Sequence, residues 1–454
     1  MLQAVCLAVV VGGAQGPAPY NYKGRLIDLM PPGTSWGMPS TGQAVQIVIT
    51  DGGSKIGLSE FKIKAAKWDS EAPLKIENLK YSSGVLTGDV RFENASGRVL
   101  EGVRFDFVSA SELYKGKDAQ GKDVILSRSQ PLMEESPILF GDMPKGAQSE
   151  AYPVKAAGLS WKPETAQITV TAKLSGLTYD KVVFKAHPGS DLDFDANDKL
   201  LLGSHSKPAI YSADPENDSL QSIAATPQAH VVIGVNKADG TICASWWNSH
   251  DFAFYSAAGD QQSKVAEDDK TEGMNGWPNM ARYDGKGNLY LGFGQTVCQI
   301  VGGKPAFVLK SAGATRFANY IFFDVAKDGS LFVGSKSDVF RFEPGGKNPK
   351  QILQGPDVKL GTIHGVKALR LDSNRYLWIA DNADEHFAGR ICVFDSNGKF
   401  VWTFGRAADV APVGNTILDG QVSQSIDSIA ISGDGHVYVA NGEGARSVMA
   451  FTEF

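Results

Sequence analysis

Three of the seven histidines could bind one transition metal if the fold brings them together. His205 and His250 are expected to follow the second strands of two neighbouring repeat units, and His230 precedes the first strand of the later unit. Neutral imidazoles are good zinc ligands, and three of them leave one coordination position open. The candidate metal ligands are therefore His205, His230 and His250, and the identity of any cofactor stays open between zinc and calcium.

Calcium is the alternative cofactor, although the sequence contains no complete calcium loop. Asp193 and Asp195 begin like such a loop, but its sixth position is Asp198 rather than glycine. Its twelfth position is Ser204 rather than glutamate. A strand that enters a turn explains this segment better.

A second group of residues could bind a polar organic ligand, because all of them flank expected strands on one side of the repeat units. An arginine there pairs bidentately with a carboxylate or sulfate, and a tryptophan forms an apolar wall. Polar residues also collect wherever loops are long, so the grouping has a purely structural alternative. The predicted ligand-binding residues are Arg316, Asn279, Asp427, Trp246, Trp277 and His364.

The elements that would position these residues come from an internal repeat. A pattern of three strand-favouring residues followed by a small residue recurs six times, with Asp-Gly turns before several copies. A repeat of this length with four strands per unit is typical of a propeller blade. The small residues lie at positions 203, 244, 292, 334, 380 and 440.

The fifth unit resembles the NHL repeat at residues 366–372, 377–381, 390–395 and 397–400, and the sixth unit repeats part of this pattern. The resemblance covers residues from about 180 to 454 and implies a six-bladed β-propeller of TolB-like architecture. In that family most propellers serve recognition and a minority are enzymes.

A looser resemblance concerns the lactonase-type propellers. The residues around Asn279 and Asp427 resemble the positions of an asparagine and an aspartate metal ligand in that group. The Glu-Gly-Pro motif that supplies the glutamate ligand of the group is absent here. A lactonase activity is therefore an alternative and not the main expectation.

The first part of the chain shows a different strand pattern. Short alternating segments between turns, such as residues 45–49 and 85–92, predict an antiparallel Ig-like β-sandwich over residues 44–175. The propeller is expected over 176–454, with 176–190 as a linker that contains a closing strand at 181–186. This strand would complete the last blade, since too few residues follow 451 to form its fourth strand.

The N-terminus resembles an export signal. Residues 4–11 form an apolar run that is too short to span a bilayer, and small residues follow it. The sequence thus predicts a signal peptide at 1–14, an extended lead-in at 15–43 and a secreted, periplasmic or cell-surface protein. A buried N-terminal strand is the alternative reading of the apolar run.

Composition narrows the class of function. Lys and Arg number 44 against 50 Asp and Glu, so the net charge is −6 and no overall basic field would attract nucleic acid. No other segment is apolar enough to cross a membrane. The main prediction is a non-catalytic recognition or scaffold protein that binds a protein, peptide or carbohydrate at the propeller rim. The alternative is a metal-dependent hydrolase, lactonase or lyase with its site at the channel mouth.

Overall fold

The computed structural model describes residues 22–454 apart from several short segments. These segments are 59–61, 66–67, 72–73, 134, 186–188, 248, 266–273, 275–277, 319, 356–358, 382–388, 406–419, 424 and 443–446. The expected signal peptide at 1–14 lies outside the described residues. Within them, no helix has the length and apolar character that a membrane crossing requires.

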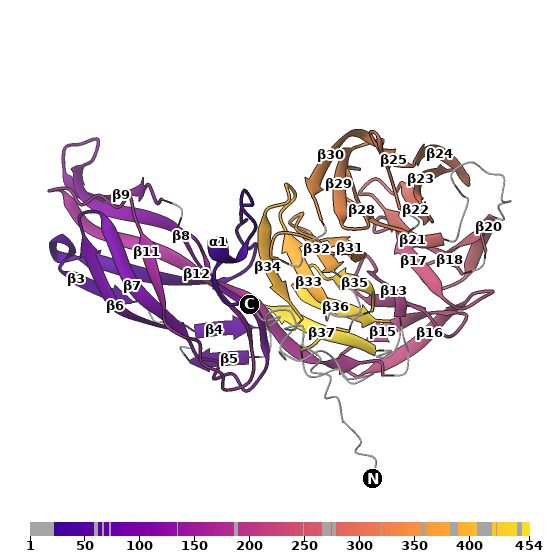
Figure 1. The fold of residues 1–454 in the computed structure, drawn as a ribbon, viewed down its shortest axis with the longest axis horizontal. Coiled ribbons are helices and arrows are strands. Elements are labelled where there is room, and N and C mark those ends of the chain that lie inside the picture. The colour runs from indigo at the N-terminus through magenta and orange to yellow at the C-terminus, as the bar shows by residue number, and fades with distance from the viewer. Residues whose placement is uncertain are drawn as a thin grey trace, which may run out of the picture.

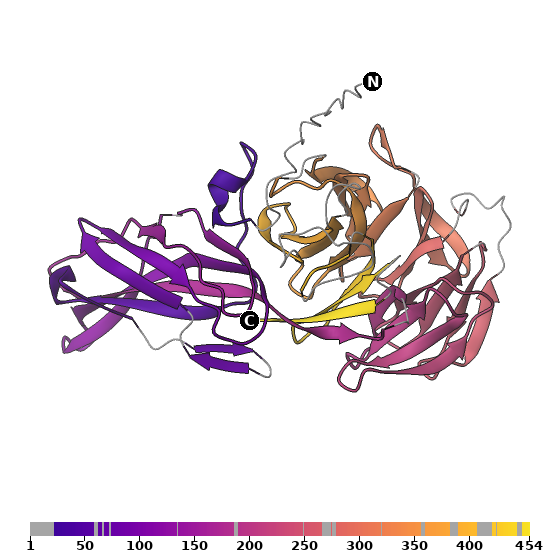
Figure 2. The same ribbon diagram turned by 60° about the horizontal axis from the view of Figure 1, so that its bottom comes forward.

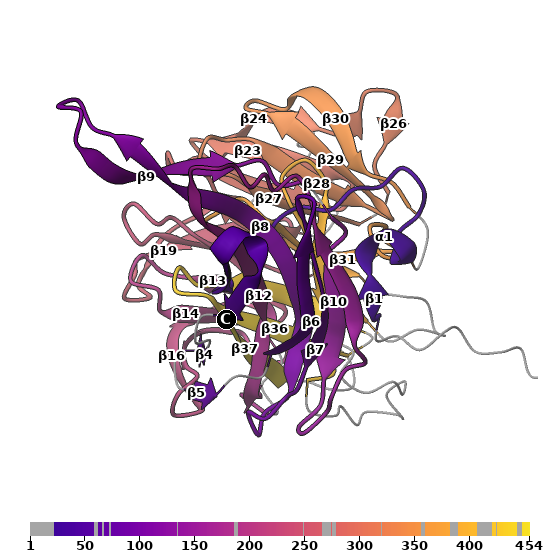
Figure 3. The same ribbon diagram turned by 90° about the vertical axis from the view of Figure 1, so that its left-hand side faces the viewer.

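The N-terminal region consists of two antiparallel sheets (Figures 1 and 3). The larger sheet has the order β1-β10-β8-β12, with β2 and β3 beyond β12 and β9 paired to β8. The smaller sheet has the order β11-β7-β6. The strands of the larger sheet are β1 (Gly24–Arg25), β2 (Gln43–Thr50), β3 (Lys55–Leu58), β8 (Leu100–Lys117), β9 (Asp123–Gln130), β10 (Ile138–Met143) and β12 (Thr165–Val183). Those of the smaller sheet are β6 (Leu74–Ser82), β7 (Val85–Phe92) and β11 (Tyr152–Ala156), and a separate hairpin contains β4 (Lys62–Ala65) and β5 (Trp68–Glu71).

Alternation of apolar and polar residues explains this arrangement. In β2, Val45, Ile47 and Ile49 are buried, while the residues between them are more exposed. Successive side chains of a strand point to opposite faces, so these three share one face of the sheet. They pack in one hydrophobic core with Val90 and Phe92 of the smaller sheet.

The C-terminal part is a β-propeller (Figure 1). Among the described residues, six four-stranded antiparallel units follow one another, and the innermost strands contact each other in the closed order β13, β17, β21, β27, β31, β35 and back to β13. Blade 1 comprises β13 (Gly189–Phe194), β14 (Leu200–Ser204), β15 (Ala209–Asp214) and β16 (Ser219–Ala225). Blade 2 comprises β17 (Val231–Val235), β18 (Ile242–Trp246), β19 (Phe252–Tyr255) and β20 (Gln261–Val265). Blade 3 comprises β21 (Pro278–Tyr283), β22 (Leu289–Phe293), β23 (Thr296–Val301) and β24 (Lys304–Leu309).

The remaining blades follow the same plan. Blade 4 comprises β27 (Ile321–Val325), β28 (Leu331–Ser335), β29 (Asp338–Glu343) and β30 (Lys347–Leu353). Blade 5 comprises β31 (Val366–Leu371), β32 (Leu377–Asp381), β33 (Arg390–Phe394) and β34 (Phe400–Phe404). Blade 6 comprises β35 (Ile426–Ile431), β36 (His436–Asn441) and β37 (Ser447–Glu453), with its fourth strand supplied by β12. A small hairpin of β25 (Ser311–Ala312) and β26 (Thr315–Arg316) precedes blade 4.

The repeated small residue has a packing cause. A Cβ atom at Gly203 of β14 would overlap the carbonyl oxygen of Val231, which begins the innermost strand of the next blade. At Gly334 of β28, the same atom would meet the side chain of Val366 in the next blade. The small residue therefore lets each blade approach the next one closely.

The long strand β12 belongs to both parts of the molecule. Its residues 167–174 pair with β2, and its residues 177–183 pair with β37 of blade 6. Lys181 lies opposite Ala450 and Val183 opposite Val448, so the closing segment expected at 181–186 pairs over 181–183. Figure 2 shows the yellow C-terminal strands beside the end of β12. The expected boundary at 175/176 falls inside this continuous strand.

The lead-in is not extended throughout, in contrast to the expectation for residues 15–43. It contains the single helical turn α1 (Leu26–Leu29), and Leu26 is buried in a core that blades 4 and 5 share. Further along, Gly37 donates a backbone hydrogen bond to Phe400, and Phe400 donates one to Ser35. The lead-in thereby covers the outer edge of blade 5, where unpaired backbone groups would otherwise be exposed.

Buried polar contacts join β8 to blade 5. The guanidinium of Arg104 pairs with Asp106, at 2.7 Å and 2.8 Å, and also donates to the carbonyl oxygens of Gly37 and Val401. Earlier on the same strand, the carboxyl of Glu101 accepts a hydrogen bond from the amide of Gly405 at 2.8 Å. Burial, and the neighbouring Asp142 carboxylate, raise the pKa of Glu101 well above its ordinary value. The two parts of the molecule are therefore held by specific polar contacts as well as by β12.

Candidate functional site

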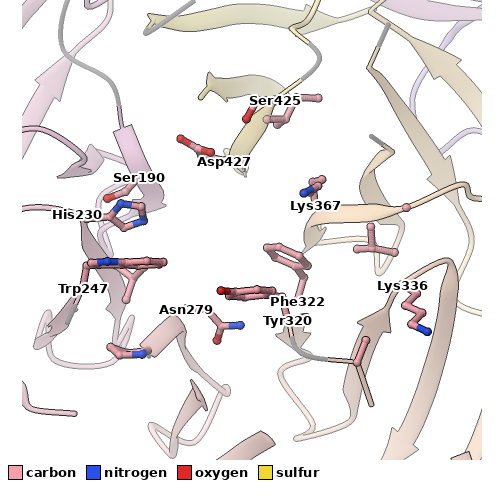
Figure 4. A pocket seen from close by; sticks show the side chains of 16 residues that line it. Ser190, His230, Trp247, Asn279, Tyr320, Phe322, Lys336, Lys367, Ser425 and Asp427 are labelled. Atoms are coloured by element: carbon pink, nitrogen blue, oxygen red, sulfur yellow. The ribbon is translucent and has the colours of Figure 1, made fainter. Parts of the chain in front are cut away.

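The main cavity lies at the end of the ring where the innermost strands begin (Figure 4). It has a volume of about 780 Å³, a size typical of small-molecule sites. Every blade contributes the second residue of its innermost strand to the wall. We call these six residues the mouth ring: Ser190, Val232, Asn279, Phe322, Lys367 and Asp427.

Four blades place a polar residue in the mouth ring by means of a β-bulge. The pairing with the second strand shifts register between the first and third residues of β13, β21, β31 and β35. The residue skipped in each case is Ser190, Asn279, Lys367 or Asp427. Bulges redirect side chains and are frequent beside binding sites. The register continues without a shift in blades 2 and 4, which contribute Val232 and Phe322.

Two aromatic walls face each other across the cavity (Figure 4). On one side, the ring of His230 lies 4.9 Å from that of Trp247 and 4.3 Å from that of His205. On the other side lie Tyr320 and Phe322, and Tyr320 is 52% exposed. Flat apolar surfaces in this arrangement suit a ligand with a ring.

Burial keeps the aromatic wall of blade 2 uncharged. It lowers the pKa of His230 to about 4, and the nearby ring of His205 adds to this effect. His230 is thus neutral at physiological pH. Its backbone adopts a left-handed conformation, with φ of 59°, immediately before β17. This conformation sets the direction in which the ring leaves the chain.

The polar groups of the mouth ring differ in the hydrogen bonds that they make within the protein. Ser190 donates to the carbonyl oxygens of Gly203 and Val231, so its hydroxyl proton is shared within the blades. The amide nitrogen of Asn279 donates to the carbonyl oxygen of Ile321 at 2.6 Å, and its Oδ1 accepts no hydrogen bond from the described residues. This Oδ1 atom is itself buried and lies against Gly292, so the blades fix the orientation of the amide.

Charged groups of both signs line the same cavity. Lys367 and Asp427 occupy neighbouring positions of the mouth ring, and both point into the cavity in Figure 4. Lys336, which follows β28, lies at the margin. Within the described residues, neither lysine has an ion-pair or hydrogen-bond partner for its ammonium group.

Farther along the same strands, buried charges fill the centre of the ring. Arg282 binds Asp191 through two hydrogen bonds of 3.0 Å and 3.1 Å, and Arg370 lies 3.7 Å from Asp193. Arg282 also lies 3.9 Å from Asp324. We call Asp191, Asp193, Arg282, Asp324 and Arg370 the central ion cluster. Its members are at least nine-tenths buried except for a small exposed part of Asp193, so the centre of the ring is closed to solvent at this level.

The charges of the central ion cluster depend on one another. Burial alone would raise the pKa of Asp193, but Arg370, Lys237 and Arg282 outweigh burial and the pKa is lowered. For Asp324, burial outweighs the attraction of Arg370 and Arg282, and the pKa is raised. Burial would lower the pKa of Arg282, but Asp191, Asp324 and Asp193 together outweigh burial and the pKa is raised.

The three histidines predicted to bind zinc do not form one site. His205 and His230 stack on each other, but Nδ1 of His250 lies 2.8 Å from the carbonyl oxygen of Met274. No three His, Cys, Asp or Glu side chains of the described chain gather as a metal site requires. His250 is on the loop between β18 and β19, and its ring contacts the segment that precedes blade 3.

The structure brings together two of the predicted ligand-binding residues and separates others. Asn279 and Asp427 line the cavity, but Arg316 is an exposed residue of the β25–β26 hairpin and does not. Trp246 is 1% exposed inside the core of blades 1 and 2, so it forms no wall of the cavity. His364 is next to the lining residue Gly365 without itself lining the cavity. Trp277 lies outside the described residues.

Sequence reasoning missed several residues of the site. Trp247, Tyr320, Phe322 and Lys367 all line the cavity, and none was among the predicted ligand-binding residues. An alignment of the six innermost strands would have found Lys367, because it has the same position in residues 366–371 as Asp427 has in 426–431. For the central ion cluster, the available signal is a charged residue inside an apolar strand, as at Arg282 and Arg370.

Comparison with known proteins finds likeness only at the level of structure. No protein-family model matches the chain, and no curated protein matches it either. A protein of unknown function from Bacteroides thetaiotaomicron is similar over 86% of this chain and 100% of its own, with 12% identity and a TM-score of 0.45. A streptogramin B lyase covers 62% of this chain and 98% of its own, with 12% identity and a TM-score of 0.40. A gluconolactonase from Xanthomonas campestris covers 62% of this chain and 90% of its own, with 12% identity and a TM-score of 0.42.

Proposed function

We propose that this protein is a non-catalytic recognition protein that binds a carbohydrate in the cavity of the mouth ring. The observation that carries this proposal is the pair of aromatic walls, Trp247 with His230 and Tyr320 with Phe322, on opposite sides of one cavity. A sugar ring has apolar C–H faces that pack on aromatic rings and hydroxyl groups around its edge.

The polar groups of the cavity support the same ligand class. Asp427 lines the cavity with a carboxylate and Asn279 lines it with an amide, the polar groups that hydrogen-bond to hydroxyls. Sugar hydroxyl groups both donate and accept, so they match a wall that mixes acceptors with an ammonium group. A few placed polar groups between apolar walls are the usual composition of a small-molecule site.

The test is calorimetric titration of the wild-type protein and of Trp247→Ala with a panel of neutral and acidic sugars. We expect at least one sugar to bind the wild type and the variant to bind it about tenfold more weakly or worse, from the lost stacking area. Tyr114→Ala, a matched change of a half-buried ring in the N-terminal region, is the control and leaves affinity unchanged. Equal affinity of Trp247→Ala and wild type would contradict the proposal.

A metal-dependent hydrolase, lactonase or lyase is the second candidate, since Asn279 and Asp427 share the cavity. The described residues add no group of three His, Cys, Asp or Glu to hold the ion, so the residues present do not fit it and we derive no metal-dependent step. Metal analysis of the purified protein, with thermal melting before and after chelation, separates the two candidates. A stoichiometric metal whose removal lowers the melting temperature would favour the enzyme.

The proposal extends to the type of blade, the type of N-terminal domain and the location of the protein. We infer that the blades are of the NHL type, supported by the sequence of the fifth unit, with TolB-like architecture. We also infer that the N-terminal region is an Ig-like sandwich, supported by its two antiparallel sheets around one core. An export signal at 1–14 would place the protein outside the cytoplasm, where a glycan, protein or peptide ligand is available. N-terminal sequencing of protein recovered from the periplasm or medium tests the export signal.

A further inference from the structure

The mouth ring contains one cation whose charge the protein does not use. Lys367 is exposed, and its ammonium group points into the cavity between the aromatic walls (Figure 4). Within the described residues it has no ion-pair or hydrogen-bond partner. A compact, strongly hydrated ammonium group in a concave site is a ready partner for an anionic ligand group.

Four other cations of the propeller each lie within 4 Å of a carboxylate. Arg282 and Arg370 lie in the central ion cluster, and Lys237 lies 3.7 Å from Asp193. Arg390 binds Asp381 at 2.7 Å. Lys367 thus differs from its surroundings, because every one of these neighbours has a partner within the chain.

The backbone that carries Lys367 is held in place by one of these paired groups. The Oδ1 atom of Asp381 accepts hydrogen bonds of 2.9 Å from the amides of His364 and Gly365, while its Oδ2 atom binds Arg390. These hydrogen bonds fix the backbone segment that precedes the bulge at Lys367. The protein fixes the position of the lysine and leaves its charge available.

Asp427, on the next blade, limits which anion fits. Its carboxylate is in the wall of the same cavity as Lys367, so an anion bound there is near a negative charge as well as an ammonium group. A doubly charged phosphate beside Lys367 would also be repelled by the Asp427 carboxylate. A single carboxylate is repelled less, and hydroxyl groups on the same ligand can donate to Asp427.

We propose that the carbohydrate bound in this cavity is an acidic sugar, with its carboxylate at Lys367 and its hydroxyl groups toward Asp427 and Asn279. This inference rests on the proposed function, which names the cavity as a carbohydrate site. The ring of the sugar lies between Trp247 and the wall formed by Tyr320 and Phe322. The same chemistry is present in a free uronic acid and in the terminal uronic acid of a glycan chain.

The experiment compares matched acidic and neutral sugars by calorimetric titration. The probes are glucuronic and galacturonic acids, their methyl esters, glucose, galactose and a galacturonic acid trimer. We expect an acid to bind about tenfold more tightly than its ester, since a hydrogen bond between two charged groups is stronger than one to a neutral ester. In Lys367→Met this preference disappears while weak binding of the ester persists. Lys350→Met, at an exposed lysine of β30, is the matched control and keeps the preference.

The outcomes separate this inference from the proposed function. Equal affinity for acid and ester, or a preference that survives in Lys367→Met, would overturn the acidic-sugar inference alone. Binding of sulfated sugars as tight as that of the carboxylates would overturn the assignment to a carboxylate. Failure of every sugar to bind would overturn the proposed function as well. Tighter binding of the trimer than of the monomer identifies a glycan end as the source, and equal binding identifies the free acid.

Discussion

The mouth ring and the central ion cluster lie on the same six innermost strands, yet they use charge in opposite ways. In the central ion cluster, Arg282 and Arg370 face three aspartates and each cation has a carboxylate within 4 Å. In the mouth ring, Lys367 has no such partner among the described residues. The comparison shows that a charged residue on an innermost strand either pairs inside the ring or, as at Lys367, keeps its charge available at the cavity.

Backbone geometry produces this difference. The polar residues of the mouth ring lie at bulges, where the second residue of the strand drops out of the ladder and turns toward the cavity. Arg282 and Arg370 lie three residues later in regularly paired strands, where Arg282 is opposite Tyr290 and Arg370 is opposite Trp378. Regular pairing directs them into the closed centre of the ring, so they serve the stability of the fold.

Removing one member of the central ion cluster should have the largest effect. We expect Arg282→Met to lower the free energy of unfolding by about 3–5 kcal/mol, because Asp191 is left as a buried carboxylate without its bidentate partner. Urea denaturation followed by tryptophan fluorescence measures this change. Lys367→Met, in the mouth ring, should stay within about 0.5 kcal/mol of the wild type. If both variants unfold at the same urea concentration, the distinction between the central ion cluster and the mouth ring is wrong. If Arg282→Met does not fold, Arg282→Lys is measured in its place.

A substitution below the mouth ring should weaken both ligand binding and stability. A Cβ atom at Gly292 would overlap Oδ1 of Asn279 and would lie 3.0 Å from the ring of Phe323. We expect Gly292→Ala to displace Asn279, to weaken sugar binding about tenfold and to lower the free energy of unfolding by about 1–3 kcal/mol. Calorimetric titration and urea denaturation measure the two effects.

The matched control is Gly57→Ala, since a Cβ atom at Gly57 meets no atom within 4 Å. It should leave both quantities unchanged. Unaltered sugar affinity in Gly292→Ala would mean that Asn279 takes no part in binding.

The aromatic wall of blade 2 should make stability sensitive to acid through His230. The pKa of His230 is about 4 in the folded protein and near 6.5 when unfolded, so the unfolded chain takes up the proton first as the pH falls. This stability is present above pH 6.5 and is lost as the pH falls toward 4. We expect a loss of about 1 kcal/mol, allowing for the solvent that reaches the ring.

The variant His230→Asn tests this expectation, because asparagine tolerates the left-handed backbone at this position. Its free energy of unfolding should change less than that of the wild type between pH 6.5 and 4. An identical pH dependence in the two proteins would assign the acid sensitivity to other groups.

The sequence was sufficient to predict the propeller and two residues that line its main cavity. The repeated small residues and Asp-Gly turns mark the strands, and Asn279 and Asp427 come directly at the start of innermost strands, where no insertion intervenes. Arg316 also precedes an innermost strand, but residues 311–316 form a hairpin of their own that carries it away from the cavity. Spacing alone does not reveal such an insertion.

The wrong prediction that Trp246 lines the cavity has a different cause. Trp246 is the last residue of β18 and points into the core, while Trp247 follows it and faces the cavity. Side chains alternate along a strand, so moving the expected strand end by one residue exchanges the two faces. Strand ends cannot be read from sequence to within one residue. The bulge at Lys367 was missed for a related reason, because a bulge changes register without a distinctive residue type.

The smallest effect should come from Lys336, at the margin of the cavity. Its ammonium group is unpaired among the described residues, as that of Lys367 is, but it lies farther from the space between the aromatic walls (Figure 4). We expect Lys336→Met to weaken the binding of an acidic sugar by less than about twofold, and only at low salt, because salt screens charges beyond about 10 Å at 0.1 M. Titration at two ionic strengths measures this. A loss in Lys336→Met as large as in Lys367→Met, and independent of salt, would move the anion position from the bulge of blade 5 to the loop after β28.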